Sequence, residues 1–291
     1  EFRRVLFRSH IIPGDPVDIM LGEKASLEDK ANLRAQLGLD QALSTQFGAY
    51  LKSLLVHFDL GMSIQSRKPV TQELLTSFPA TVELALGALL LATLIGIPLG
   101  ILCAIKRHSF YDISFTFFSL LFMSMPGYWL GPMLIWIFAI HFGWFPVSDR
   151  GTLAHLFLPA LSLALPLSAV QMRMTRAAML ETIREDYITT AKAKGLSRWR
   201  VYCKHALANA LIPVITILSL QAGALLTGTV ITEMIFDWPG LGTMLLNAIQ
   251  QRNYTLVQGA VLFIALIYIV VNLLTDIIYG WVNPQIRVGG G

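Results

Sequence analysis

The chain alternates between long apolar segments and shorter polar ones. Five segments are apolar over most of their length, at residues 80–105, 113–139, 153–172, 211–235 and 257–281. A helix of about twenty apolar residues crosses the hydrocarbon core of a bilayer. The pattern therefore predicts an all-α, polytopic membrane helix bundle with five spans, which together form a membrane domain at residues 80–281.

Helix-breaking and small residues fall inside these predicted spans. Among them are prolines, and two glycines four residues apart that form a small-xxx-small pair: Pro98, Pro126, Pro159, Pro166, Gly96 and Gly100. In a membrane such residues permit kinks and close helix approach when neighbouring helices satisfy the backbone. They predict a tightly packed bundle of several helices, and they fit a transporter and a membrane enzyme equally well.

The polar stretch between the third and fourth predicted spans is strongly basic. Residues 171–213 contain eight Lys or Arg against three Asp or Glu, an excess typical of cytoplasmic loops. Alternation of sides then predicts a cytoplasmic C-terminal tail at 282–291 and an extracytoplasmic position for residues 10–79. Because an exported segment needs a helix before it, we infer that the first helix of six is missing. Residues 1–9 resemble no later part and are interpreted as non-native.

Residues 10–79 are predicted to form a small helical region outside the membrane. Ser26 precedes a short helical pattern, and a second apolar face follows at residues 43–55. A lid packed on the membrane domain is the favoured interpretation, and direct contact with a substrate is the alternative.

Composition agrees with a membrane protein. The 291 residues are 55% hydrophobic and 14% charged, whereas soluble domains contain about 25% charged residues. The net charge of +4 follows from cations in cytoplasmic loops, so nucleic acid is not expected as a partner and membrane lipid is. Cys103, Cys203 and the six histidines show no metal-ligand spacing. Phosphate-loop, nucleophile-elbow and zinc-protease motifs are absent from the sequence, so we expect no catalytic, metal or cofactor site in this chain.

Two acidic residues within spans could bear on function. Asp276 could be a proton site in a secondary transporter, although a helix-pairing or interfacial acid is the favoured interpretation. Glu83 is expected in the first turn of its span, within reach of the outer interface. A membrane-embedded enzyme would need converging catalytic groups, which the pattern does not offer. Other polar side chains within spans are expected to form interhelical hydrogen bonds: Ser119, Ser124, Ser162, Ser168 and Gln221.

The basic stretch is predicted to contain two short helices. Met179, Ile183 and Tyr187 follow one another at four-residue spacing, which predicts a helical apolar stripe. Gly195 supplies a helix stop and Ser197 a new N-cap. Small residues beside cations fit a surface bound by a soluble partner, and an ordinary solvated loop fits the same pattern.

A family resemblance bears on this choice. Residues 189–208 resemble the conserved cytoplasmic loop of binding-protein-dependent ABC importer permeases, which reads Glu-Ala-Ala, three residues, Gly, nine residues, Ile, one residue, Leu-Pro. Three positions agree, namely Ala191, Gly195 and Leu207, and four depart, namely Thr189, Thr190, His205 and Ala208. The fragment Ala-Lys-Gly-Leu, ending at Leu196, is typical of the peptide and nickel branch. Three further fragments resemble the first permease subunit of that branch: residues 12–16, 238–242 and 283–284.

The resemblance implies a fold and a set of partners. The fold would be that of type I ABC importer permeases, in the bacterial inner membrane. The partners would be a second homologous permease, two ATPase subunits that bind the ATP, and an extracytoplasmic solute-binding protein that delivers di- or oligopeptides or nickel complexes. The loop at 173–210 would hold a coupling helix at 186–196. The residues expected to couple to an ATPase are Asp186, Tyr187, Ala191, Lys192, Ala193, Gly195, Leu196 and Leu207.

Overall fold

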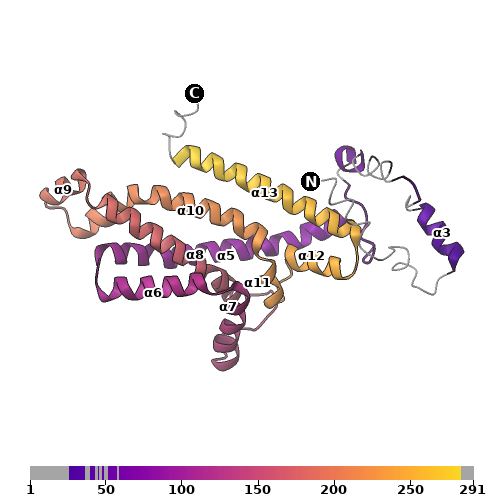
Figure 1. Ribbon diagram of the computed structural model, residues 1–291, viewed down its shortest axis with the longest axis horizontal. Coiled ribbons are helices and arrows are strands. Elements are labelled where there is room, and N and C mark those ends of the chain that lie inside the picture. Colours follow the sequence, from indigo (N-terminus) through magenta and orange to yellow (C-terminus); the bar gives the residue numbers. More distant parts are fainter. Residues whose placement is uncertain are drawn as a thin grey trace. The chain divides into compact units, whose positions relative to one another are not determined.

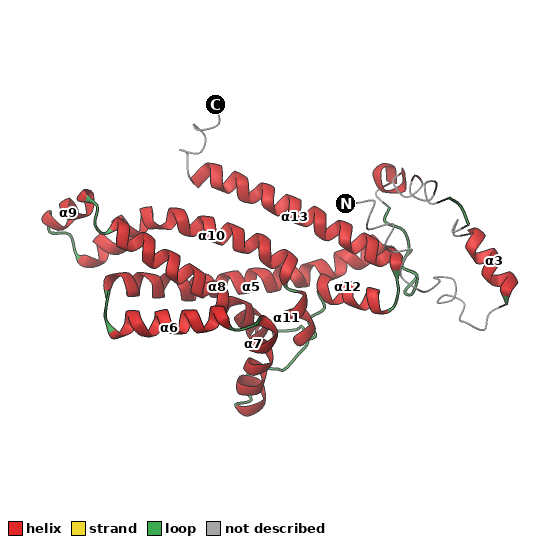
Figure 2. Cartoon of the chain, viewed as in Figure 1, coloured by secondary structure: helices red, strands yellow, loops and turns green. Residues whose placement is uncertain are grey.

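The computed structural model describes residues 26–36, 40–42, 45, 48, 52–57 and 59–282. Within these ranges the chain is helical, apart from loops and one isolated bridge between Met62 and Pro69 (Figure 2). The chain divides into two compact units, Glu1–Pro79 with Gly240–Leu266, and Ala80–Pro239 with Ile267–Gly291. The predicted all-α class is confirmed.

Figure 1 shows the order of the helices along the chain. The first part contains α3 (Leu27–Gln36), the π-helix η1 (Ser53–His57), α5 (Val70–Ile105), α6 (Phe110–Ser124), α7 (Gly127–Leu134) and the π-helix η2 (Ile135–His141). The second part contains α8 (Leu153–Thr182), α9 (Asp186–Ala193), the π-helix η3 (Arg200–Ala206), α10 (Leu207–Gly228), α11 (Val230–Ile235), α12 (Leu241–Gln250) and α13 (Tyr254–Val282).

Apolar helices lie at all five predicted places, and at four of them a single helix is long enough to span a membrane. Four are single spans, at Val70–Ile105, Leu153–Thr182, Arg200–Leu226 and Tyr254–Thr275. The fifth is a pair, Phe110–Ser124 and Gly127–His141, bent by 110° at the break. The span predicted at 113–139 is thus a bent pair of helices, with the bend beside one of the prolines expected to permit kinks. Met125 precedes Pro126 and has an extended backbone with ψ 128°, because the proline ring disfavours a helical conformation in the residue before it.

In the second unit α8 packs against α5, α6 and α10. A Cβ atom on Gly96 of α5 would lie 2.7 Å from the carbonyl oxygen of Ser168, and one on Gly100 would lie 2.6 Å from that of Met172. Both distances are shorter than van der Waals contact. The glycine pair thus permits the close helix approach that the sequence predicted.

Polar side chains in the spans form two kinds of hydrogen bond. Contrary to expectation, the four serines donate to carbonyl oxygens of their own helices, three or four residues earlier. A serine in a helix reaches its own backbone more easily than a neighbouring helix. Gln221 of α10 forms the expected interhelical bonds, accepting from Gln171 of α8 at 2.7 Å and donating to the carbonyl of Leu167 at 3.1 Å.

Of the two acidic residues singled out in the spans, Glu83 differs from expectation in its place within the helix. Glu83 lies well inside α5, not in its first turn, and forms an ion pair of 2.6 Å with Arg150. Helix α5 begins ten residues before the apolar pattern, at Val70, which moves Glu83 away from the helix end. The side chain of Asp276 lies outside the described residues.

Glu233, which the sequence patterns did not single out, is fully buried in α11. Its Oε1 accepts hydrogen bonds from the hydroxyls of Thr81 at 2.8 Å and Thr229 at 2.9 Å. Nearby, the indole of Trp238 donates to the carbonyl of Ala80 at 2.7 Å. These bonds fasten α11 to the α5 residues of the same unit.

In the first unit a loop at 59–69 is fastened to the start of α13. The buried side chain of Asn253 donates to the hydroxyl of Ser63 at 2.7 Å and accepts from the backbone N–H of Ile64 at 3.2 Å. Ser26 caps α3, as predicted, by accepting from the backbone N–H of Asp29. Most of the second predicted helix, at 43–55, lies outside the described residues.

Candidate functional site

Two long helices extend into the basic stretch from both sides. Helix α8 continues to Thr182, and a helical segment that includes η3 leads directly into α10. Only α9 is a short separate helix, so the prediction of two short helices is half wrong. The predicted stripe is also interrupted, because α8 ends between Met179 and Tyr187. The backbone N–H of Glu185, bonded to the carbonyl of Thr182 at 3.2 Å, closes the turn between α8 and α9.

The ends of α9 carry charges that suit the helix dipole. Asp186 lies in its first turn and Lys192 in its last. A carboxylate near the N-terminus and an ammonium near the C-terminus each stabilise a helix by about 0.3–1 kcal/mol. The sequence thus favours a helix at this place although it is only eight residues long.

Gly195 terminates α9 through a Schellman motif. Its N–H donates to the carbonyl of Lys192 at 3.0 Å, and the N–H of Leu196 donates to that of Ala191 at 3.4 Å. The φ of Gly195 is +78°, a left-handed conformation that side chains other than glycine rarely adopt. The helix stop predicted at Gly195 is confirmed, and its cause is the left-handed backbone conformation of this glycine.

A hydrophobic core joins the inner face of α9 to three other helices. Ile188 and Ala191 of α9 are buried in it. The other buried members come from the end of α5, the end of α8 and the start of the following helix: Ala104, Ala178, Met179, Val201, Ala206 and Ala210. Because interiors are close-packed, α9 is held firmly to the ends of these helices.

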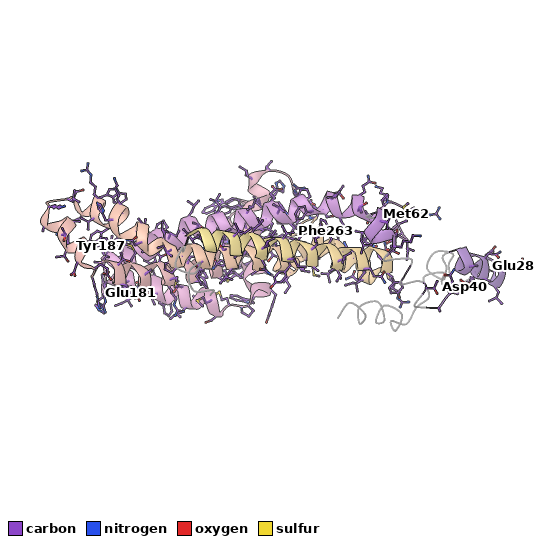
Figure 3. All side chains as sticks on the ribbon, turned by 90° about the horizontal axis from the view of Figure 1, so that it is seen from above. Glu28, Asp40, Met62, Glu181, Tyr187 and Phe263 are labelled. Carbon is purple, nitrogen blue, oxygen red and sulfur yellow. The ribbon has the colours of Figure 1, made fainter. Side chains whose placement is uncertain are left out.

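The other face of α9 is open to solvent. Five of the predicted coupling residues are exposed, namely Asp186, Tyr187, Lys192, Ala193 and Gly195. Tyr187 lies at the end of the second unit occupied by α9 (Figure 3), and its hydroxyl accepts a hydrogen bond of 2.6 Å from the amide of Asn209. A Cβ atom on Gly195 would meet open space.

The remaining three predicted coupling residues face the interior of the chain. Ala191 is 8% exposed, and Leu196 and Leu207 are half-buried against the same core. The family resemblance implied that the small side chain of Ala191 lies on the surface bound by an ATPase. The structure instead uses its small size to bring α9 close to the neighbouring helices, since Ala191 falls on the same helix face as Ile188.

An ion pair near this core was not anticipated from the sequence. Arg176 of α8 binds the carboxylate of Asp112 in α6 with Nε at 2.6 Å and Nη2 at 2.8 Å. Only the tertiary fold brings together these two residues, which are 64 positions apart. Among the described residues, no group of three or more His, Cys, Asp or Glu side chains could hold a metal ion.

Comparison with protein families identifies the class of this helix bundle. Residues 96–288 match the family model described as the binding-protein-dependent transport system inner membrane component, and residues 4–85 match the model for the N-terminal part of such membrane components. The chain belongs to this family. It is therefore a multi-pass inner membrane component of an ABC importer, as its resemblance predicted.

Individual relatives match over almost the whole permease. It is 45% identical to the dipeptide transport system permease protein of Escherichia coli K12, over 96% of this chain and 91% of the relative. It is 44% identical to a di/tripeptide transport system permease protein of Pseudomonas aeruginosa, over 95% and 91%. A glutathione transport system permease protein of Escherichia coli O6:H1 is 38% identical, over 96% and 90%.

Solved structures show the same fold at low sequence identity. An inward-facing methionine ABC transporter matches with a TM-score of 0.60 and 18% identity, over 73% of this chain and 97% of that one. An amino acid ABC transporter matches with a TM-score of 0.56 and 14% identity, over 72% and 94%. The predicted fold of ABC importer permeases is confirmed.

Proposed function

We propose that this permease moves short peptides, di- and oligopeptides, across the inner membrane into the cytoplasm. The observation that carries the proposal is its 45% identity to a dipeptide permease over 96% of the chain. Relatives named for dipeptides, di/tripeptides and glutathione all transport molecules with peptide bonds. Nickel complexes, the other cargo that the resemblance implied, remain a prediction.

Helix α9 is the segment proposed to bind an ATPase subunit. Its solvent-exposed face presents Asp186, Tyr187, Lys192 and Ala193, and its C-terminal turn presents Gly195. Its inner face is packed on the ends of α5 and α8 and on the helix that becomes α10. A short helix that is exposed on one side and firmly packed on the other suits the transfer of movement from a bound protein to a membrane bundle.

The other parts of the transporter follow from membership of the family. A second permease subunit would complete the translocation pathway, two ATPase subunits would bind ATP, and a solute-binding protein would deliver the cargo. The excess of cations in residues 171–213 supports a cytoplasmic position for α9 and for the C-terminal tail. Residues 10–79 would then lie on the extracytoplasmic side.

In the proposed mechanism, the closed and the open ATPases would each favour a different conformation of the permease. ATP-bound, closed ATPases would bind α9 in one position, and open ATPases in another. Because α9 shares a buried core with three helices, their ends would move together and open the pathway to the opposite side. No catalysis by this chain is needed.

The test replaces Gly195 by Glu in the complete transporter. A glutamate there has open space around it, yet it adds bulk and charge to the proposed ATPase-binding surface. Gly143→Glu is a matched control, because Gly143 also has a positive φ, +65°, with no atom within 4 Å of its Cβ position. Copurification of the ATPases and ATP-dependent uptake of labelled dipeptide into proteoliposomes are measured.

We expect Gly195→Glu to remain inserted but to lose ATPase binding and uptake, while Gly143→Glu retains both. Full uptake by Gly195→Glu would disprove the coupling role of α9. Uptake that persists without ATPases and collapses with a protonophore would instead indicate the proton-coupled alternative, which requires Asp276.

A further inference from the structure

The start of α6 is held to α8 by an ion pair between Asp112 and Arg176. Asp112 takes part in four hydrogen bonds. Asp112 accepts two hydrogen bonds from Arg176, at 2.6 and 2.8 Å, and a third from the backbone N–H of His108 at 3.0 Å. The backbone N–H of Asp112 itself is directed at the hydroxyl of Ser109, which caps α6. All these groups lie in the second unit.

The geometry of this pair restrains both helices. The side chain of Asp112 is 5% exposed and that of Arg176 is 29% exposed, so water competes little for the carboxylate. Two parallel bonds from a planar guanidinium fix orientation as well as distance, which a single bond from an ammonium does not. The pair therefore resists rotation and sliding of α6 against α8.

The ion pair lies directly beside the core that holds α9. Arg176 is two and three residues before Ala178 and Met179 of α8, both of which are buried in the core that contains Ile188 of α9. A displacement of α9 that moves the end of α8 must therefore move Arg176. Since Arg176 holds Asp112, the start of α6 must follow.

We propose that the Asp112–Arg176 pair transmits the movement of α9 to α6, and through α6 to the bend at Met125. The inference depends on the proposed function, because it assumes that an ATPase moves α9. Asp112 and Arg176 are positioning residues in this scheme. Without the pair, α6 would stay packed on α8 but its start could rotate and slide, so the movement of α9 would reach α6 incompletely and more ATP would be hydrolysed for each peptide imported.

The test measures ATP hydrolysed per dipeptide imported by the complete transporter in proteoliposomes. The variants are Asp112→Asn, Arg176→Lys and the charge exchange Asp112→Arg with Arg176→Asp. We expect each single variant to raise the ratio by about five- to tenfold, which corresponds to loss of an energetic coupling of about 1.0–1.4 kcal/mol. The charge exchange should return the ratio toward that of the unaltered protein, because it rebuilds an ion pair.

A purely structural role would lower the amount of assembled transporter and leave this ratio unchanged, which would overturn the proposal. If a single variant fails to insert, the neutral pair Asp112→Asn with Arg176→Gln replaces it, since it leaves no unpaired charge. A raised ratio in the neutral pair supports the proposal, and an unaltered ratio overturns it.

Another ion pair among the described residues of this unit provides the control. Glu83 and Arg150 are 2.6 Å apart and equally charged, but they do not join α6 to α8. Glu83→Gln should therefore leave the ratio of ATP to peptide unchanged. Failure of the proposed function itself would appear separately, as absence of ATP-dependent uptake in the unaltered transporter.

Discussion

Gln171 of α8 donates its side-chain amide to the side-chain oxygen of Gln221 in α10, at 2.7 Å. Gln171 is fully buried and Gln221 is 8% exposed. In a bilayer such an interhelical bond stabilises by about 0.6–2 kcal/mol, and it also fixes the register of the two helices.

Replacement of the two glutamines by leucine should have unequal effects. Gln221→Leu leaves both polar atoms of Gln171 unpaired, because Oε1 of Gln171 already has no described partner. Gln171→Leu leaves Gln221 with its bond to the carbonyl of Leu167. We expect Gln221→Leu to cost about 2 kcal/mol and Gln171→Leu less than about 1. Thermal unfolding in detergent measures both, and the double variant should recover part of the loss; equal effects would contradict the assigned bonds.

Alanine substitutions in α5 should lower stability most where the added Cβ atom would meet the backbone of α8. Alanine at Gly96 or Gly100 would place Cβ against backbone carbonyls of α8, which cannot move without shifting the helix. Each change should cost about 1–3 kcal/mol. Gly87→Ala is the control, because its nearest neighbour is a flexible side-chain methyl of Leu156 at 3.2 Å. An unfolding temperature as low for Gly87→Ala as for the other two would argue against the close contact of α5 and α8.

Two alanines of α9 should respond in opposite ways to enlargement. Ala191→Leu overfills the buried core and should lower the free energy of unfolding by about 1–3 kcal/mol. Ala193→Leu lies on the exposed face and should leave stability within about 0.5 kcal/mol. Under the proposed function, Ala193→Leu should nevertheless weaken ATPase copurification. If Ala193→Leu were the less stable of the two, the orientation of α9 described above would be wrong.

Replacement of Asn253 should loosen residues 59–69 of the first unit without unfolding the rest of the protein. Asn253→Leu removes a donor and an acceptor that fasten residues 59–69, leaving the hydroxyl of Ser63 and the N–H of Ile64 without this partner. An unsatisfied buried polar group costs about 1–3 kcal/mol. Hydrogen exchange of residues 59–69 should become faster, while exchange in α8 stays unchanged. Faster exchange in both places would indicate global unfolding instead.

The pattern of apolar residues was sufficient to predict the spans. The position of one glycine was sufficient to predict the end of α9. A window of twenty apolar residues is a strong signal because the bilayer demands it. Gly195 was predictable because a left-handed residue after a helix is so often glycine. The bend at Pro126 was only partly predictable, since a proline indicates a break in the helix but not the angle of 110°.

Contacts between distant residues were beyond sequence patterns. Glu233 was overlooked because it falls inside an apolar window, and its partner Thr81 is 152 residues away. Asp112 reads as an ordinary helix-start acid until α8 brings Arg176 to it. The side of α9 that faces inward was also unpredictable, because alanine suits both an internal core and an external surface.

The bend after α6 has a consequence for the surrounding lipid. Helix α6 has 15 residues, or about 22 Å at 1.5 Å per residue, whereas the hydrocarbon layer is about 30 Å thick. The aromatic side chains of Tyr128, Trp129 and Trp136, which follow the bend, are exposed and suited to the headgroup level. This hydrophobic mismatch should make the bilayer thinner beside α6, so that the length of the lipid acyl chains becomes a determinant of transport rate.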